Sequence, residues 1–233
     1  KYSEPITLIT DGALGIQSFI FALLLAFYLA KNVEGTIKKE STLNWALCFF
    51  SMGIFALAGA IGHFTTSEEI YWSVWPFCVS FGAVALFFAN LEVQVLFFGS
   101  RKYQFVKTLI PYAVVQILII VFNYAFIWFG VYLVYTVAVY FILYFIDKKS
   151  GSQDRDTDKT KFIKVVGIYL FVFLILGIIQ TIAKAAGWVI FFGPNSEYLF
   201  QPGNEIFHVA ALILNQVFYS KLKVYLAFQP NKE

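Results

Sequence analysis

Charged residues are scarce in this chain. Only 13% of its 233 residues are Asp, Glu, Lys or Arg, whereas 60% are hydrophobic and 20% are aromatic. An average soluble domain has about 25% charged and about 45–50% apolar residues. The composition therefore excludes a disordered chain, a collagen-like chain and almost any soluble globular domain. The net charge is +3, and no basic stripe is interleaved with aromatics, so we expect no nucleic-acid partner. What remains is a polytopic membrane protein.

Cysteine and the common catalytic motifs are scarce as well. The two cysteines, Cys48 and Cys78, lie inside apolar runs, which predicts small buried thiols rather than a disulfide or a metal pair. The sequence has no glycine-rich phosphate loop, no serine nucleophile elbow, no Cys-x-x-Cys pair and no His-Glu-x-x-His motif. The middle of the last apolar run, from Ala210 to Gln216, has no lysine for a retinal. Function must therefore depend on isolated polar residues.

Long apolar runs are abundant. Runs such as 16–30 and 165–179 do not alternate in polarity, which predicts helices rather than the strands of a barrel. A spanning helix needs about 20 apolar residues, so the chain can hold seven in one all-α domain, residues 1–233. We expect the seven transmembrane helices at 7–30, 42–64, 70–98, 106–129, 131–147, 162–192 and 204–221. The uncharged stretch 109–146 is divided at Gly130 because glycine favours a turn.

Basic residues lie almost entirely on one side of these spans. The segments 31–40, 99–107, 147–164 and 221–233 contain 15 of the 17 Lys and Arg residues. The positive-inside rule then predicts an N-terminus outside and a cytoplasmic C-terminus, as an odd number of spans requires. The polar segment 147–161 is expected to be a cytoplasmic linker. We expect an integral membrane protein, in a cell membrane or an endomembrane, with membrane lipids and other membrane subunits as its partners.

Ionisable groups inside membrane spans are costly, so each one is a functional candidate. We expect four of them near the outer face: Asp11, His63, Glu205 and His208. Glu205 and His208 are three residues apart and share one helical face. Gln180 and Lys184 of the sixth span are expected in the same outer half, and Asn123 of the fourth span is expected not far below them.

The inner half of the predicted bundle has fewer polar residues. Asn90 and Glu92 lie toward the inner end of the third span, and we expect Glu92 to reach the cytoplasmic interface. Asn44, near the start of the second span, is expected to form a hydrogen bond either between helices or to its own turn. Gly53 and Gly59 belong to a small-residue face of the second span, which is typical of close helix packing.

The outer residues are compatible with three uses. A catalytic zinc site has three protein ligands and one open position for water. His63, His208 and either Asp11 or Glu205 could supply the ligands, and the remaining carboxylate could act as the catalytic base for attack on an ester or amide. Alternatively, Asp11, His63, His208 and Lys184 could form the buried proton or ion network of a carrier. The third interpretation is structural, because carboxylates near helix starts cap free N–H groups.

Two short motifs carry a family resemblance. Gly62-His63-Phe64 ends the second span, and residues 204–208, Asn-Glu-Ile-Phe-His, open the seventh. With the outside N-terminus, they resemble the superfamily of alkaline ceramidases and progestin/adiponectin receptors. The resemblance implies a seven-helix membrane fold over the whole chain. It also implies a catalytic zinc held by a histidine at the end of the second helix and by histidines in the seventh.

The sequence departs from that family at specific positions. The family has two histidines four residues apart in its seventh helix, whereas Asn204 and Leu212 stand four residues before and after His208. Gly59 occupies the position of a family serine. The departures favour a non-enzymatic membrane subunit or receptor. A zinc-dependent lipid amidase or esterase and an ion or small-solute carrier remain as alternatives.

Overall fold

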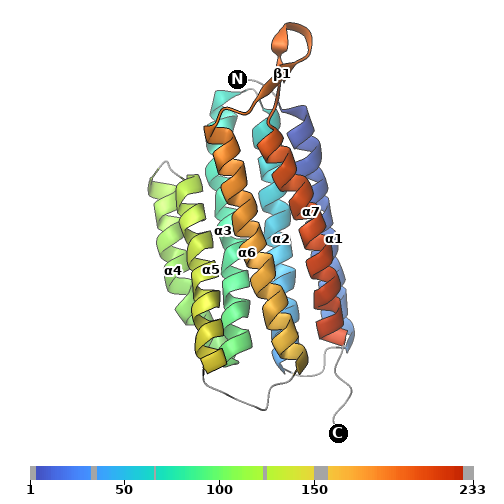
Figure 1. Ribbon diagram of the computed structural model, residues 1–233, viewed down its shortest axis with the longest axis vertical. Helices are drawn as coiled ribbons and strands as arrows, with labels where there is room; N and C mark the ends of the chain where they lie inside the picture. The colour runs from blue at the N-terminus through green and yellow to red at the C-terminus, as the bar shows by residue number, and fades with distance from the viewer. Residues whose placement is uncertain (1–3, 33–35, 66, 123–124, 150–156, 228–233) are drawn as a thin grey trace.

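The computed structural model describes residues 4–32, 36–65, 67–122, 125–149 and 157–227. These residues form an all-α bundle with one short hairpin (Figure 1). The helices are α1 (Pro5–Asn32), α2 (Thr36–Phe64), α3 (Glu68–Phe98), α4 (Arg101–Val121), α5 (Ala125–Lys149), α6 (Thr157–Ala185) and α7 (Pro202–Ala227). We call the end where α1 and α7 begin the upper end, and the opposite end, where α7 stops, the lower end.

Helix α3 shows how local sequence sets the helix limits. The Ser67 side chain caps its start by accepting a hydrogen bond from the Ile70 N–H, and Glu68 and Glu69 follow in the first turn, where the helix dipole favours negative charge. Gly99 ends the helix with a φ of 67°, a left-handed conformation that glycine adopts without steric cost. The Gly99 N–H donates to the Val95 carbonyl, so the helix stops with a satisfied last turn.

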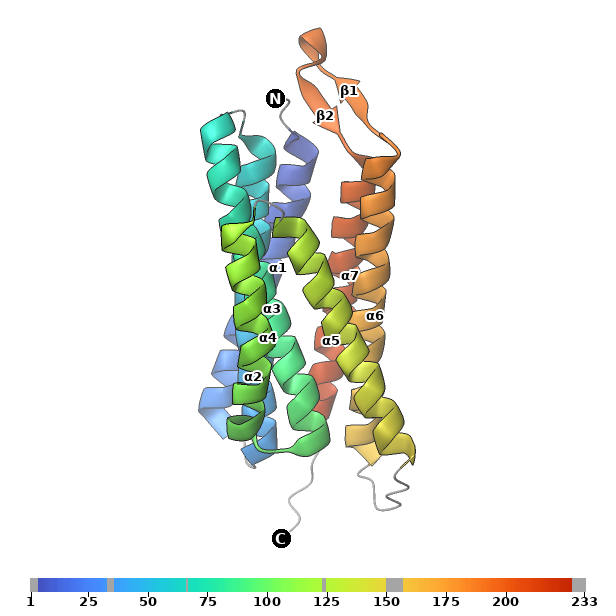
Figure 2. The ribbon, with the colours of Figure 1, turned by 90° about the vertical axis from the view of Figure 1, so that its left-hand side faces the viewer.

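The helices are arranged around α3. It contacts α2, α4, α5 and α6, whereas α7 packs between α1 and α6. Figure 1 shows α4 and α5 as a pair at the left edge of the bundle, and in Figure 2, where this side faces the viewer, they lie in front of the other helices. Large aromatic side chains fill the lower half between α2, α6 and α7: the ring centroids of Trp45 and Phe218 are 4.4 Å apart, and those of Tyr169 and Phe218 are 4.2 Å apart. These ring contacts form an aromatic core that packs α2, α6 and α7 against one another in the lower half of the bundle.

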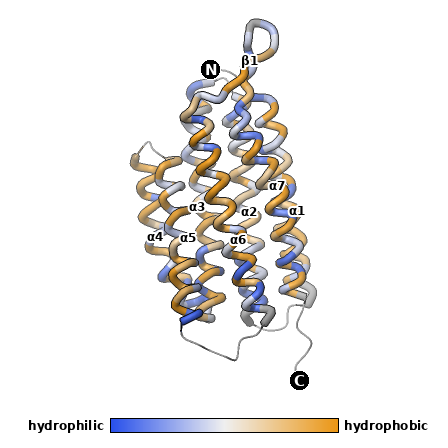
Figure 3. The backbone as a smooth tube through the Cα atoms, in the orientation of Figure 1, coloured by the Kyte–Doolittle hydropathy of each residue, from blue (hydrophilic) through white to orange (hydrophobic). Residues whose placement is uncertain are grey.

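Six of the described helices, α1 to α6, are long and apolar enough to cross a membrane. Their outer faces expose large apolar side chains, such as Ile110 and Ile120 on α4. Figure 3 shows hydrophobic colour along most of each helix and polar colour concentrated near the ends. Helix α7 is 26 residues long but more polar, with Glu205 near its start and Lys221 and Lys223 near its end.

The element limits differ from the sequence prediction in three places. Helix α4 ends at Val121 and α5 begins at Ala125, so the two helices do not divide at Gly130, which is an ordinary helical residue inside α5. The span predicted over 162–192 is too long, because α6 ends at Ala185. The chain then forms a hairpin of β1 (Ile190–Phe192) and β2 (Tyr198–Phe200), joined by a 3-10 turn at Pro194–Ser196. Much of the predicted linker 147–161 is helical, and its residues 150–156 lie outside the described residues.

Side chains from neighbouring helices tie α7 to the bundle below its upper end. Halfway down, the Tyr169 hydroxyl donates to Asn215 Oδ1 (2.9 Å), and Asn215 Nδ2 donates to the Met52 sulfur (3.3 Å). At the lower end, the Tyr28 hydroxyl (3.0 Å) and the Lys38 ammonium (2.9 Å) both donate to the Leu226 carbonyl. The last carbonyls of a helix have no intrahelical partner, so these two donors satisfy a carbonyl that the end of α7 leaves without one.

The lower-end contact predicts a stability effect. Lys38→Met keeps the length of the side chain but removes the charged donor to the Leu226 carbonyl. We expect it to lower the free energy of unfolding by about 1–3 kcal/mol, the usual effect of losing a hydrogen bond from a charged group in a buried site. Thermal unfolding of the detergent-solubilised chain measures the change. Lys39→Met, at the exposed neighbouring position, is the control, and equal melting temperatures for the two variants would contradict the assignment.

Candidate functional site

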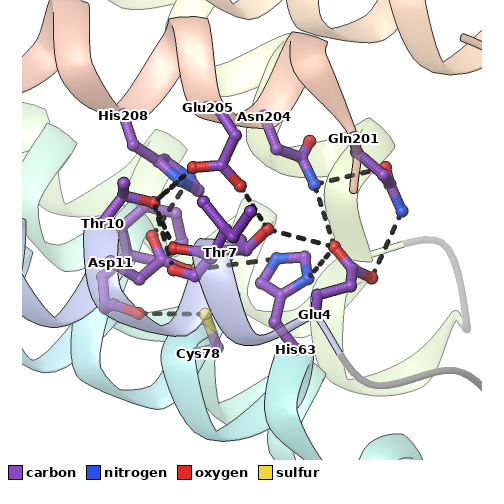
Figure 4. A network of polar contacts seen from close by, with 12 residues as sticks. Glu4, Thr7, Thr10, Asp11, His63, Cys78, Gln201, Asn204, Glu205 and His208 are labelled. Atoms are coloured by element: carbon purple, nitrogen blue, oxygen red, sulfur yellow. Dashed lines mark hydrogen bonds and ion pairs between the residues drawn. The ribbon is translucent and has the colours of Figure 1, made fainter. Parts of the chain in front are cut away.

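Polar side chains gather at the upper end of the bundle, where α1, α2 and α7 meet (Figure 4). They come from the start of α1, the end of α2 and the start of α7, so segments far apart in the sequence build one site. We call this group the acid–imidazole cluster. It consists of Glu4, Thr7, Thr10, Asp11, His63, Gln201, Asn204, Glu205 and His208.

Helix α1 supplies one polar stripe. Thr7, Thr10 and Asp11 are spaced at i, i+3 and i+4 and therefore share a face. The Thr7 hydroxyl donates to Glu205 Oε1 (2.6 Å), and the Thr10 hydroxyl donates to Glu205 Oε2 (2.9 Å). Asp11 lies in the second turn of α1, which begins at Pro5, so it does not cap that helix. The stripe serves to bind α7.

Asp11 lies between the two histidines of the chain. Its Oδ1 is 3.0 Å from Nε2 of His208, and its Oδ2 is 4.0 Å from Nε2 of His63. The ring centroids of the two imidazoles are 6.5 Å apart. Nδ1 of His208 is 3.1 Å from the Thr10 hydroxyl, so both nitrogens of this ring have partners on α1. The structure thus brings together Asp11, His63, Glu205 and His208, the four residues that the sequence places near one face.

Glu4 closes the cluster at its upper edge. Its Oε2 is 3.0 Å from Nδ1 of His63 and 3.3 Å from the Thr7 hydroxyl, which is also within reach of Glu205. Its Oε1 accepts from Gln201 Nε2 at 3.2 Å. The Glu4 N–H donates to the carbonyl of His63 at 3.1 Å. Backbone and side chain of this one residue therefore connect α1 to the ends of α2 and α7.

Charge balance in the cluster is unusual. Glu4, Asp11 and Glu205 are each at most 8% exposed, and within the part of the chain that the structure describes, the imidazoles of His63 and His208 are the basic groups paired with Glu4 and Asp11. Even with both imidazoles protonated, three ionised carboxylates would leave one negative charge. Buried charges persist only where hydrogen bonds or opposite charges compensate them, and here threonine and amide donors do so. The network is a set of interdependent partners rather than a row of separate ion pairs.

Close packing presses the cluster against α2. A Cβ atom added at Gly59 would lie 3.2 Å from Asp11 Oδ2 and 3.8 Å from the Cys78 sulfur. The small-residue face predicted for α2 therefore has a definite role, because Gly59 lets the Asp11 carboxylate approach the helix. Cys78 is fully buried and its thiol donates to the Phe55 carbonyl at 3.2 Å.

The other candidate residues lie in different places. Gln180 reaches the edge of the cluster, where its Nε2 donates to Asn204 Oδ1 (2.9 Å). Lys184 is exposed and does not join the groups drawn in Figure 4. Asn123 lies outside the described residues. Asn90 and Glu92 are buried in the lower half of α3. Glu92 is 0% exposed, so the expectation that it reaches the interface is wrong; the side chain turns toward Asn44 instead.

Sequence reasoning missed several members of the cluster. Thr7 and Gln201 carry no charge, and Glu4 precedes the first apolar run, so none of them stands out as a costly intramembrane group. The i, i+3, i+4 spacing of Thr7, Thr10 and Asp11 was the one available signal. The contribution of Glu4 and Gln201 depends on the angle at which α1 meets α7, which no local pattern encodes.

The cluster has the donor types of a metal site but not the geometry. Among the described residues, no three His, Cys, Asp or Glu side chains come together in a way that could hold a metal ion. The carboxylates and imidazoles are instead paired with one another at hydrogen-bond distances. In this form the arrangement joins α1, α2 and α7 through hydrogen bonds and ion pairs between their side chains.

The packing at Gly59 predicts opposite effects for two similar substitutions. Gly59→Ala places a methyl group against Asp11 Oδ2, and we expect a loss of about 1–3 kcal/mol, as for other overpacked sites. Gly12→Ala, next to Asp11 in the chain, meets no atom within 4 Å and should add up to about 1 kcal/mol through helix propensity. Melting temperatures in detergent test both. A Gly59→Ala variant as stable as Gly12→Ala would show that Asp11 is not held against α2.

Comparison with known proteins assigns the chain to a family. No curated protein and no solved structure matches it. A family model described as "Family of unknown function (DUF6962)" matches residues 6–224, a range that includes nearly all of the seven helices and every member of the acid–imidazole cluster except Glu4. The chain therefore belongs to the family of unknown function DUF6962.

Proposed function

We propose that the chain is an integral membrane protein that crosses the bilayer seven times, with its N-terminus outside and its C-terminus in the cytoplasm. The length and apolarity of α1 to α6 support six of the spans. The uneven distribution of basic residues, 15 of 17 in segments that meet at one end, supports the orientation. In this orientation the upper end, with the acid–imidazole cluster, faces the outside.

The seventh span is supported by packing. Helix α7 lies between α1 and α6, and its 26 residues correspond to a length of about 39 Å at 1.5 Å per residue. Four of its polar residues, Asn204, Glu205, His208 and Asn215, are buried in the bundle, whereas Gln216 and, near the lower end, Lys221 and Lys223 are exposed. A helix held between two spans, with these four polar residues hidden from lipid and its lysines near the lower end, crosses the membrane with them.

We infer further that the protein is a non-enzymatic membrane subunit or receptor. The observation that carries this proposal is the closed pairing of the cluster, in which Asp11, Glu4 and Glu205 are bonded to histidine and threonine side chains of the chain itself. A catalytic zinc site needs an open ligand position and a water. A group whose members satisfy one another is suited to couple α1, α2 and α7, so that a change at the outer surface reaches all three helices.

A zinc-dependent lipid amidase or esterase is the second candidate. It is favoured by the position of the Asp11 carboxylate between the two imidazoles. His63, His208 and Asp11 would be the ligands, and Glu205 the base that takes a proton from water. In this arrangement the ligating ring nitrogens of His63 and His208 must move toward one common point, because zinc–nitrogen bonds are about 2.0–2.1 Å long. At present the two rings pair with carboxylates instead.

The orientation can be tested by cysteine labelling. Glu197→Cys lies in the hairpin, between the 3-10 turn and β2, and Lys148→Cys lies near the lower end of α5; both positions are exposed. We expect a membrane-impermeant maleimide added to intact cells to label Glu197→Cys but not Lys148→Cys, and to label both after permeabilisation. The parent chain is the control because Cys48 and Cys78 are buried. The reverse labelling pattern would invert the proposed topology.

Metal content separates the two functional candidates. For a non-enzymatic protein we expect the purified chain to contain far less than one zinc per chain and to release no fatty acid from amide- or ester-linked lipids. About one zinc per chain, retained in Gln216→Asn but lost in His208→Asn, would favour the hydrolase instead. Elemental analysis gives the ratio, and Gln216 is a suitable control position because it is an exposed polar residue two turns further along α7.

A further inference from the structure

The turn from α3 to α4, at the lower end of the bundle (Figure 2), holds an arginine in a fixed position. Arg101 is the first residue of α4 and is partly exposed. Its side chain reaches α2, where its Nε donates to Asn44 Oδ1 at 2.9 Å. Asn44 is 0% exposed, and its Nδ2 donates to Glu92 Oε2 at 2.9 Å. Neither the family assignment nor the proposed function gives Arg101 a role.

Three contacts hold Arg101 before any ligand arrives. Besides the bond from its Nε, its backbone N–H donates to Glu40 Oε2 at 3.3 Å, and its guanidinium carbon lies 5.9 Å from the centre of the Phe105 ring. A guanidinium is a planar fork of N–H donors. Within the described part of the chain, the two terminal nitrogens of Arg101 form no hydrogen bond. They are therefore positioned donors that lack an acceptor.

The charge around the turn is positive. Lys102 is exposed next to Arg101, and Lys107 is exposed in the second turn of α4. Two carboxylates lie nearby: Glu92, which is completely buried, and Glu40, which is partly exposed. With both of them ionised, the three basic residues still leave a surplus of one positive charge. This balance favours an anionic ligand.

We propose that Arg101 and Lys102 bind the phosphate of an anionic phospholipid headgroup at the lower end of the bundle. The terminal nitrogens of a guanidinium match two phosphate oxygens at once, and a lysine at the membrane surface attracts anionic lipids. Asn44 is a positioning residue, because it holds the Arg101 Nε, and Glu92 holds Asn44 in turn. The inference rests on the proposed membrane insertion but not on the role of the acid–imidazole cluster.

An apolar stripe on α4 favours a lipid over a free phosphate ion. The stripe continues the face of Lys102 at i+3 and i+4 spacing and consists of four exposed residues: Val106, Leu109, Ala113 and Ile117. Ile117 is 15 residues after Lys102, about 22 Å along the helix. This exceeds the share of one leaflet in a hydrocarbon core of about 30 Å. A lipid with its headgroup at Arg101 and Lys102 therefore lays an acyl chain on this stripe.

The lipid preference of the purified full chain in detergent tests the proposal. Dioleoyl phosphatidylglycerol and dioleoyl phosphatidylcholine have the same acyl chains, but only the first has a net negative charge. Native mass spectrometry counts the lipids that each chain retains in a titration. We expect the chain to bind phosphatidylglycerol at least about tenfold more tightly, the effect of hydrogen bonds to an uncompensated charge. Equal affinity for the two lipids would overturn the proposal.

Two variants of Arg101 distinguish a positioned site from general surface charge. Arg101→Gln removes the charge, whereas Arg101→Lys keeps the charge but has no planar fork. We expect both to lower the affinity for phosphatidylglycerol at least about tenfold through the lost hydrogen bonds. Lys223→Gln, at an exposed position near the lower end of α7, removes the same charge elsewhere and should bind like the parent chain. Parent-like binding by Arg101→Lys would refute the assignment.

Two further variants keep the test independent of folding. Lys102 is exposed, so Lys102→Gln should weaken phosphatidylglycerol binding without lowering the melting temperature. Replacing Asn44 and Glu92 together by Leu leaves no buried charge alone. We expect this double variant to lose the preference for phosphatidylglycerol while its affinity for phosphatidylcholine stays unchanged, a difference that a purely structural role would not produce. An unchanged preference in both variants would contradict the proposed site.

Competition identifies the source of the phosphate. Inorganic phosphate shares the chemistry of the headgroup but has no acyl chain to lie on α4. We therefore expect millimolar sodium phosphate to leave phosphatidylglycerol bound. Its displacement at that concentration would assign the site to a soluble phosphate compound and overturn the lipid proposal. A chain that retained neither phospholipid would instead contradict the proposed membrane insertion.

Discussion

The structure depends on one constraint: polar groups buried in an apolar bundle must find partners in the bundle itself. The helix backbones meet this requirement within each helix, but the side chains of Glu4, Asp11, Glu92 and Glu205 cannot. Each is nearly or completely buried, and each lies next to a donor from another helix. The scarcity of charge in the sequence makes these few residues the points at which the helices recognise one another.

Two groups satisfy the constraint in different ways. The acid–imidazole cluster joins α1, α2 and α7 and is closed, since its carboxylates and imidazoles bond to one another and to threonine and amide groups. A second group joins α2, α3 and α4 at the lower end, where Asn44 Nδ2 donates to the buried Glu92 carboxylate and Arg101 Nε donates to Asn44 Oδ1. Both groups suit a role in coupling helices.

The two clusters are also separated. Gly59, at the upper cluster, and Asn44, at the lower one, are 15 residues apart on α2, or about 22 Å along the helix. The side chains between them include Ala56, Met52 and Cys48, and the neighbouring aromatic core contains Trp45, which is 0% exposed. A carrier of ions would be expected to have a chain of polar groups along this stretch. The apolar interval favours two independent sites over one pathway.

Much of the fold follows from hydrophobicity alone. Runs of about 20 apolar residues can form little other than helices, and the basic segments between them alternate in a way that is independent of tertiary packing. Helix ends that depend on tertiary packing could not be predicted from the sequence. Helix α6 ends at Ala185 and a hairpin follows, although residues 186–192 are largely apolar. The uncharged α4–α5 region offered glycine as the best local break, whereas α4 ends at Val121 and α5 begins at Ala125.

For the candidate site, the sequence by itself determined which ionisable residues lie at the same level, because the position of Asp11, His63, Glu205 and His208 in their helices is a matter of counting residues from each end. Only the tertiary structure decided their partners. The rotation of each helix about its axis directs Asp11 between two imidazoles, brings Glu4 and Gln201 into the cluster, leaves Lys184 outside it, and turns Glu92 inward to Asn44. That rotation results from side-chain packing between helices, such as the close contact at Gly59, and packing of this kind is a property of the assembled bundle.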